Sequence, residues 1–445
     1  MFENIIDQAA AIQLRDDIIS KKLAHSMLFF GPPASGKGSA ALELARALSC
    51  EGDLSWKCSC TACAHHRYLQ HNDLLILGPR QFSAEIAASS GAFLREPGTM
   101  PVKILFIRSL RKLMARFSPA LMEGDPKLGK LSPILQSLEE GLNEFEVKST
   151  STQDASGLEK LCKALVKDAH KLETEGIGSY IPIAHIRAAS YWCRLAPNGR
   201  RKTFVIENAD NMRDEGRNSL LKLLEEPPGT LNIVLTAKRR EAIMETLLSR
   251  LRPYRFLGRD AEKEKEVIRR VFRDSPRETG ARTLNGGGIV SAYLDSFLPQ
   301  SAEKLYPLAA FFWASLARCA AISIKKKGAG EIPAPIAALG ERYAPIAETA
   351  GFGRSVKTRD VVKTLLAESG NFEEGSISRF LSLGLDMAAQ ATRGLGTPLC
   401  IAYNDMFRKY FCEAQTAAGV LNQSPALAME ALFFKLQTAM AQGPE

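Results

Sequence analysis

Short apolar runs and helical patterns alternate in the first 260 residues. SMLFF (26–30) and TFVI (203–206) are continuous apolar runs, typical of strands buried within a parallel sheet. The segment SAALELARALSC (39–50) spaces Ala and Leu at helical intervals and contains no Gly or Pro. This alternation predicts an α/β domain with a parallel sheet.

The C-terminal third has a different pattern. RDAEKEKEVIRRVFR (259–273) is a charged helix, and no strand-like alternation follows it. Three further segments have helical spacing, namely AEKLYPLAAFFWASLARCAAISIKKK (302–327), RDVVKTLLAES (359–369) and SPALAMEALFFKLQTAMAQ (424–442). Residues 333–353, with two interior prolines and three glycines, predict a loop or a broken helix.

A block of about a hundred residues, 79–179, separates the two apolar runs. Its segments 102–117 and 157–176 are amphipathic at helical spacing, and turn-rich stretches lie between them at EGDPKLGKLSP (123–133) and KSTSTQD (148–154). The pattern predicts a small helical insertion, such as a hairpin. The first helix carries a basic set that could contact DNA or a partner, or could lie on a helix face packed on the domain: Arg108, Arg111, Lys112 and Arg116.

Composition sets the class of protein. The chain has 445 residues, enough for two or three domains, with 45% hydrophobic and 24% charged residues, as in ordinary globular proteins. No uninterrupted apolar run is long enough to span a bilayer, and MFENIIDQAA shows no signal-peptide pattern. The net charge of +9 fits a protein that works beside nucleic acid, although a basic soluble protein of another kind fits too.

Four of the nine cysteines lie within fourteen residues, and the other five are scattered. Cys50, Cys58, Cys60 and Cys63 have the spacing C-x7-C-x-C-x2-C, which can close a tetrahedral thiolate shell around a structural Zn²⁺. Free thiols are the alternative, but four of them together would be prone to oxidation. His65 could compete as a ligand, as could His66, but both are expected to be surface residues. The cysteine pattern is not a secreted disulfide framework and favours a cytosolic protein.

The stretch GPPASGKGS follows the first apolar run and matches G-x-x-x-x-G-K from Gly31 through Gly36 to Lys37. Between a strand and a helix, this pattern predicts a loop whose backbone amides hold phosphates while Lys37 contacts the outer ones. The hydroxyl that helps to bind Mg²⁺ should come next, but Gly38 stands there. Ser39 is one position late and points about 100° away on the helix.

A second apolar run, 203–206, ends in Glu207 and Asn208. A motor ATPase would carry Asp and Glu here, one for the metal and one to orient water. Asn208 is a poor general base because a neutral amide cannot take a proton. Two positions of the predicted nucleotide site that a motor ATPase needs, those of Gly38 and Asn208, are therefore altered. Whether the site binds ATP and Mg²⁺ is not decided by the sequence.

The chain resembles bacterial clamp-loader subunits of DNA polymerase III, in the AAA+ class. NSLLKLLEEPP (218–228) is the most specific match. The other matching stretches are FENIIDQ (2–8), LAHSMLFFGPPASGKGS (23–39), the four-cysteine module, HNDLLIL (71–77), IPIAHIR (181–187), LNIVLTA (231–237) and SRLRPYRF (249–256), with Leu251 in place of the family's Cys. The match covers residues 1–78 and about 180–295, is weak in the C-terminal third and absent in the middle.

Within that family the altered nucleotide site resembles the delta-prime type, which keeps the Ser-Arg pair. The resemblance implies a non-motor subunit without ATPase activity of its own. Ser249 and Arg250 would form an arginine finger that acts in a neighbour's ATP site, and Thr236 would stand at the sensor position. In NGGGIVSA (285–292), Val290 takes the place of a second sensor arginine. The implied partners are other loader subunits in a hetero-oligomeric ring, and the sliding clamp and primer-template DNA through that complex.

The resemblance also implies three domains. Residues 1–258 would form a nucleotide-binding-like domain with the zinc module 50–63 and the insertion 79–179, residues 259–298 a small helical lid, and residues 299–445 an all-α collar. A cytoplasmic location without membrane contact follows. Two alternatives stay open: an active motor subunit of the gamma or tau type, and a zinc-dependent nucleic-acid-binding module unrelated to polymerases, against which the 218–228 match argues.

Overall fold

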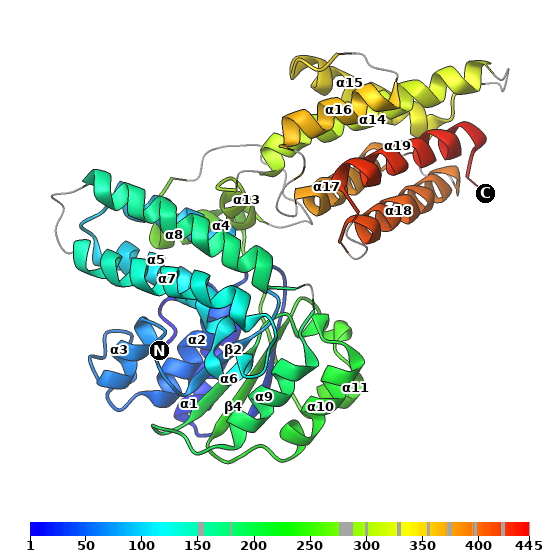
Figure 1. Cartoon of the computed structure of the whole chain (residues 1–445). Helices are drawn as coiled ribbons and strands as arrows, with labels where there is room; N and C mark the ends of the chain where they lie inside the picture. The colour runs from blue at the N-terminus through cyan, green and yellow to red at the C-terminus, as the bar shows by residue number, and fades with distance from the viewer. Residues whose placement is uncertain are drawn as a thin grey trace. The chain divides into compact units, whose positions relative to one another are not determined.

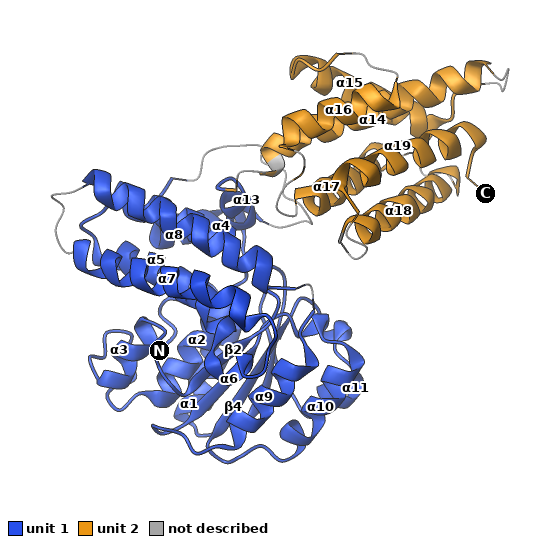
Figure 2. Cartoon of the chain, in the orientation of Figure 1, with its two compact units in different colours: residues 1–279, 287–297 blue, residues 280–286, 298–445 orange. Residues whose placement is uncertain are grey.

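The computed structural model describes residues 1–149, 155–178, 180–275, 288–298, 301–326, 331–353, 357–370, 372, 376–393, 395, 398–419 and 423–444. The chain divides into two compact units (Figure 2): unit 1 holds residues 1–279 and 287–297, and unit 2 holds residues 280–286 and 298–445.

Unit 1 is built on a parallel sheet of five strands (Figure 1). The order is β2-β3-β4-β1-β5, and each neighbouring pair is parallel. The strands are β1 (Ser26–Phe30), β2 (Leu74–Leu77), β3 (Lys202–Ile206), β4 (Leu231–Ala237) and β5 (Arg252–Arg255). The first and third of these coincide with the predicted apolar runs. The predicted fold class, an α/β core on a parallel sheet followed by a helical C-terminal part, is confirmed.

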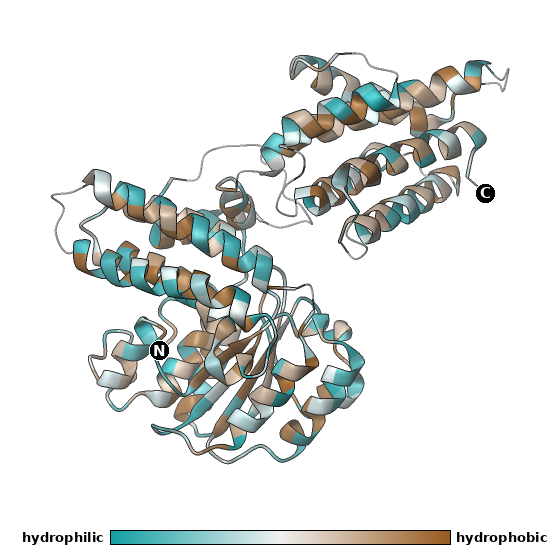
Figure 3. Ribbon diagram, viewed as in Figure 1, coloured by the Kyte–Doolittle hydropathy of each residue, from teal (hydrophilic) through white to brown (hydrophobic). Residues whose placement is uncertain are grey.

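Helices cover both faces of the sheet because its inner strands, β1, β3 and β4, are buried on both sides (Figure 3). Met27 and Phe29 pack into the core under α1 (Ala9–Ile19) and α2 (Lys37–Ser49). Leu28, between them in sequence, faces the opposite core, since side chains alternate along a strand. That second face is covered by α9 (Ile183–Arg194), α10 (Asp214–Glu225) and α11 (Glu245–Leu248). The short helix α3 (Thr61–Arg67) follows the first three cysteines of the module.

The block between β2 and α9 forms a helical layer with its own apolar core. It comprises α4 (Ser83–Arg95), α5 (Met100–Met114), a 3-10 turn (Ala115–Phe117), α6 (Pro119–Met122), α7 (Leu128–Lys148) and α8 (Ala155–Gly176). The core includes Phe93, Phe106 and Phe145, whose rings meet edge to face. The helices predicted at 102–117 and 157–176 are present, but α4 and α7 make the insertion larger than a hairpin.

The predicted turn at 123–133 is wrong in its second half. α7 begins at Leu128, and Pro133 lies inside it in the second turn. Pro133 costs the helix the hydrogen bond that an amide there would donate to the Gly129 carbonyl, and burial of Leu131 and Ile134 on either side offsets this cost. The second predicted turn, 148–154, lies mostly outside the described residues.

Two helices close unit 1. α12 (Ala261–Phe272) is the predicted charged helix, capped by the Asp260 side chain, which accepts from the Lys263 amide at 2.7 Å. α13 (Ile289–Asp295) packs with it against the insertion: Phe272 and Phe297 both lie against the core of α4 and α5. Residues 285–287 of the NGGGIVSA segment lie outside the described residues. The lid named from the resemblance stays a prediction.

Unit 2 is helical throughout the part that the structure describes. Its helices are α14 (Ala302–Lys326), α15 (Ala334–Thr349), α16 (Thr358–Ser369), α17 (Ser376–Thr392), α18 (Pro398–Gly419) and α19 (Pro425–Gln442). The loop or broken helix predicted over 333–353 is instead the single helix α15, with Pro345 inside it. Tertiary packing offsets the proline, because the buried Tyr343 donates to the Met387 carbonyl at 2.6 Å.

One described helix is long and apolar enough to cross a membrane by composition. This is α14, over Glu303–Lys326, and 72% of its most apolar window is buried inside the protein. Trp313 and Phe312 of this helix are fully buried, and they pack against rings of α17, α18 and α19. α14 is thus the central helix of the core of unit 2.

Candidate functional site: a cysteine cluster, a phosphate loop and an exposed arginine

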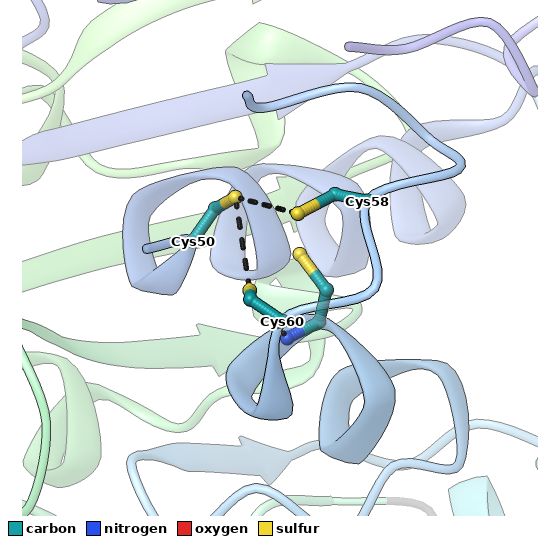
Figure 4. Close-up of side chains that lie close together, drawn as sticks. Cys50, Cys58 and Cys60 are labelled. Carbon is teal, nitrogen blue, oxygen red and sulfur yellow. Dashed lines mark hydrogen bonds between the residues drawn. The ribbon is translucent and has the colours of Figure 1, made fainter. Parts of the chain in front are cut away.

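The four cysteines converge at the C-terminal end of α2. Figure 4 shows three of them, Cys50, Cys58 and Cys60. Their sulfur atoms all lie within 4.8 Å of one another; Cys50 Sγ is 3.6 Å from Cys58 Sγ and 4.0 Å from Cys60 Sγ. A tetrahedral shell with Zn–S bonds of about 2.3 Å places its sulfurs about 3.8 Å apart, so the donor set fits a metal ion of that size. The cluster is closed by protein on all four positions, which suits a structural metal.

Two buried side chains of α2, Arg46 and Glu43, hold the cluster against that helix. Arg46 Nη1 donates to Cys63 Sγ at 2.9 Å, while its other nitrogens form a bidentate ion pair with Glu43 at 2.7 and 2.9 Å. Both side chains are buried. Such partners orient metal ligands and lower the cost of a thiolate cluster. His65 is exposed as expected, but the expectation for His66 is wrong: it is 2% exposed and stacks on His71, with ring centroids 4.1 Å apart.

The phosphate loop has the predicted place between β1 and α2. Lys37 is the first residue of α2, and its Nζ donates back to the carbonyl oxygens of Gly31 and Pro32, both at 2.6 Å. Arg259 braces the loop from outside through the Ala34 carbonyl at 2.7 Å. Burial lowers the pKa of Lys37 to about 8, against the opposing effect of Asp210 and Glu207. Ser39 is exposed and does not join the loop.

The Mg²⁺ corner of the site is filled by protein. A Cβ added to Gly38 would lie 2.5 Å from Glu207 Oε1, so a side chain at the position where a working loop carries its hydroxyl would have to displace the Glu207 carboxylate. Glu207 itself is held by Arg80 Nη1 at 3.1 Å and by Arg116 Nη2. Two guanidinium groups already neutralise the Glu207 carboxylate, which weakens it as a metal ligand. Without the loop hydroxyl and with Glu207 paired, these residues offer Mg²⁺ a poorer site than a working loop does, whereas the loop and Lys37 do fit a phosphate chain.

The pairing partners of Glu207 come from the insertion and from its entry. Arg80 lies just after β2, where Gly78 lets the chain pass beside the Glu207 backbone; a Cβ at Gly78 would lie 2.1 Å from the Glu207 carbonyl oxygen. Arg116 lies in the 3-10 turn after α5. Burial opposes ionisation of Glu207, but Arg80 and Arg116 outweigh it and lower its pKa below the ordinary value.

The four basic residues of the predicted basic helix all face protein. Arg108 donates to the carbonyls of His66 and Arg67, each at 2.8 Å. Arg111 pairs with Glu146, and Lys112 with Glu85. The prediction that this set could contact DNA is therefore wrong for the folded chain, because carbonyl oxygens and carboxylates of unit 1 already bind these side chains.

The remaining sequence-predicted residues lie at two sides of the sheet, the one where the parallel strands end and the one where they begin. Thr236, near the end of β4, is buried and its Oγ1 accepts from the Asn208 amide at 3.1 Å, so it adjoins the phosphate-loop edge. Arg250 lies at the other edge, just before β5, and is exposed. Its guanidinium donates to Glu225 Oε1 and to the Thr246 carbonyl, both at 2.6 Å, and to Ser249 Oγ at 3.1 Å. An open depression adjoins it, lined by residues that include His25, Pro227 and Arg252.

Three residues of the site were missed in the sequence. Arg80 and Arg116 pair with Glu207, and Asp210 contributes to the field at Lys37 while its Oδ1 is buried without a hydrogen-bond partner among the described residues. The position of Arg80 near Glu207 could be predicted in principle, because Arg80 follows β2, β2 is the neighbour of β3, and parallel strands end on the same side of a sheet. Nothing in the sequence places Arg116 there, because its position depends on how the insertion folds.

These features define a P-loop α/β protein of the AAA+ clamp-loader fold with a four-cysteine module. The family model described as DNA polymerase III, delta subunit, matches residues 6–129 and 115–259, which together span more than half of the chain. The chain therefore belongs to that family.

Other comparisons add less. No curated protein matches the chain. A crystal structure of a DNA polymerase III gamma-subunit-related protein from Thermotoga maritima is 14% identical, with a TM-score of 0.36, and the match covers 98% of this chain and 100% of that one. Family membership supports the resemblance at the level of the clamp loader.

Proposed function

We propose that this chain is a non-motor, delta-prime-like subunit of a DNA polymerase III clamp loader, which helps to load the sliding clamp on DNA. The filled Mg²⁺ corner supports the absence of ATP turnover: Gly38 supplies no hydroxyl, and Glu207 is neutralised by Arg80 and Arg116. Asn208 cannot act as a base. The family supplies the clamp-loader context.

The position of Arg250 carries the proposal. It precedes β5, whereas the phosphate loop follows β1, and these parallel strands pair from Met27 with Arg252 to Phe30 with Arg255. The two sites thus lie at opposite ends of adjacent strands, roughly 16 Å apart for five residues at about 3.3 Å each. Arg250 cannot reach its own loop, so an arginine finger at this position would act on the nucleotide of a neighbouring subunit.

The remaining roles follow from the same proposal. Ser249 Oγ and Glu225 position the Arg250 guanidinium, and Zn²⁺ in the cysteine cluster stabilises the module. The partners are the motor subunits of a hetero-oligomeric ring, and through it the clamp and primer-template DNA. Residues 259–298 act as lid and residues 299–445 as collar. The working location is the cytoplasm.

We expect Arg250→Ala to lower the ATPase rate of a loader reconstituted from its subunits, clamp and primed DNA. A finger stabilises charge on the transferring phosphoryl group, and its loss slows one site about a thousandfold or more. Because the other ATP sites of the loader keep their arginine fingers, the total ATPase rate falls by a smaller factor. The fractional loss equals the share of the total rate that this one site contributes. Steady-state phosphate release measures it.

Arg240→Ala is the matched control, since Arg240 is also exposed and lies between β4 and β5. It should leave the rate unchanged. An Arg250→Ala loader with the wild-type rate and normal assembly would remove the finger role. Phosphate release by the purified chain alone, abolished by Lys37→Ala, would instead favour the motor alternative.

A further inference from the structure

We propose that α8, the last helix of the insertion, binds the phosphate backbone of duplex DNA through one exposed face. We call this face the α8 lysine face, and it consists of Lys160, Lys163, Lys167 and Lys171. The inference goes beyond the proposed function, in which DNA is a partner of the assembled complex, because it gives the chain a DNA contact of its own. The helix lies in the block 79–179, outside the motifs that carry the resemblance to clamp-loader subunits.

The four lysines lie along one side of α8, which packs beside α7 (Figure 1). They follow one another at intervals of three, four and four residues, which keeps successive side chains within about 60° around the helix. All four are exposed, and together they extend over roughly 16 Å of the helix at about 1.5 Å per residue. The opposite side of the helix, with Leu158, Leu165 and Leu172, is buried in the core of the insertion.

Three of the four acidic side chains of α8 are bound by other parts of unit 1. Glu173 is buried and accepts hydrogen bonds from two backbone amides at the start of α4. Asp168 accepts from Ser137 Oγ at 2.8 Å. Glu175 pairs with Lys130 at 3.4 Å, and both of these partners lie on α7. These acids therefore turn toward the insertion, while the lysines face solvent.

Little negative charge is paired with the α8 lysine face. Glu159, the fourth acid of the helix, pairs with Lys163 at 2.6 Å, but both side chains are exposed and such a pair is weak. Glu140 and Glu144 of the neighbouring α7 bond with residues of α7 itself. Among the described residues, three lysines of the face have no ion-pair partner, namely Lys160, Lys167 and Lys171.

The chemistry of the face fits a phosphate backbone. One strand of B-DNA carries a phosphate about every 3.4 Å of its axis, so a face of this length spans about five phosphates. The only apolar residue between the lysines on the exposed side is Ala164. A membrane-binding helix would expose Trp, Phe or Leu there, and a protein interface would need aromatic anchors. Because no side chain of the face can stack on a base, we expect binding to be independent of sequence.

The test is fluorescence anisotropy of a labelled DNA duplex titrated with the full-length chain, at NaCl concentrations from about 50 to about 200 mM. Each lysine that neutralises a phosphate contributes about −0.9 to the slope of log K against log salt, so four contacts lower the affinity about a hundredfold across this range. The α8 variant replaces all four lysines by glutamine: Lys160→Gln, Lys163→Gln, Lys167→Gln and Lys171→Gln. It should make the slope shallower by about three to four and weaken binding at the lowest salt by at least about tenfold.

A variant of unit 2 is the matched control, since it removes the same charge from four other exposed lysines. It combines Lys325→Gln, Lys326→Gln, Lys357→Gln and Lys363→Gln. This variant should keep the wild-type affinity and slope. Glutamine and lysine have similar helix propensities, so both variants should fold, which circular dichroism checks. In the wild-type chain, bound DNA should protect the lysines of the α8 lysine face from acetylation, a measurement that needs no variant.

The proposal fails if the α8 variant binds DNA with the wild-type affinity and salt slope, or if the unit 2 variant loses as much as the α8 variant. A wild-type chain that binds no DNA at the lowest salt also contradicts it. Polyglutamate that binds as tightly as DNA at equal salt would assign the face to an acidic protein and overturn the proposal. None of these results bears on the Arg250 experiment, which reads out ATP hydrolysis in a neighbouring subunit.

Discussion

Replacing Cys58 and Cys60 together with serine is expected to remove the metal from the full-length chain, from about one ion to none. Two thiolates cannot hold a structural zinc, whose binding in small modules contributes about 10–16 kcal/mol to folding. The loss should unfold residues 50–67, because the core of that segment consists of the cysteines and the flanking Leu54. Elemental analysis of protein purified without chelators measures the metal, and hydrogen exchange locates the unfolding.

The cysteines outside the cluster provide the control. Cys162 and Cys193 are both buried in other parts of unit 1, so Cys162→Ala with Cys193→Ala also changes two buried thiols. This double variant should retain its metal. A wild-type chain without metal, or a Cys58/Cys60 variant that keeps one equivalent, would contradict the metal site.

We expect Glu207→Gln to lower the free energy of unfolding of unit 1 by about 3–5 kcal/mol, the cost of removing one partner from a buried ion pair. The amide keeps the shape of the side chain but leaves Arg116 without its only carboxylate among the described residues and weakens the hold on Arg80. Hydrogen exchange measured in urea at the amides of unit 1 reports on that unit, whereas tryptophan fluorescence would mix Trp56 and Trp192 with Trp313 of unit 2.

A matched variant is Glu146→Gln, whose carboxylate pairs with Arg111 but is 34% exposed. Exposure weakens an ion pair, so this change should cost at most about 1 kcal/mol. Equal effects of the two variants would show that the Glu207 network contributes nothing beyond a surface pair.

The same pair predicts a dependence on pH. The pKa of Glu207 is depressed in the folded chain, so its contribution to stability is complete above the ordinary carboxyl pKa and is lost as the pH falls through the folded pKa. The wild-type chain should therefore lose stability on acidification more steeply than Glu207→Gln, which cannot titrate there. Parallel slopes below about pH 4.5 would contradict this.

The sequence by itself determined the features that depend on local pattern. Continuous apolar runs specified buried parallel strands, four close cysteines specified a cluster at one place, and the Gly-Lys loop between strand and helix specified a phosphate site. Each of these follows from residues within about 20 positions of one another. The substitutions at Gly38 and Asn208 were visible in the same way.

Tertiary structure alone decided how distant segments complete the site. The insertion folds on its own apolar core and thereby carries Arg116 to Glu207, ninety-one positions away in sequence. Apolar spacing predicts that α5 has a buried face, but not which acids its cations meet there. Likewise, only the parallel register of β1 and β5 separates Arg250 from its own loop, because the edge at which a residue lies depends on strand direction and pairing.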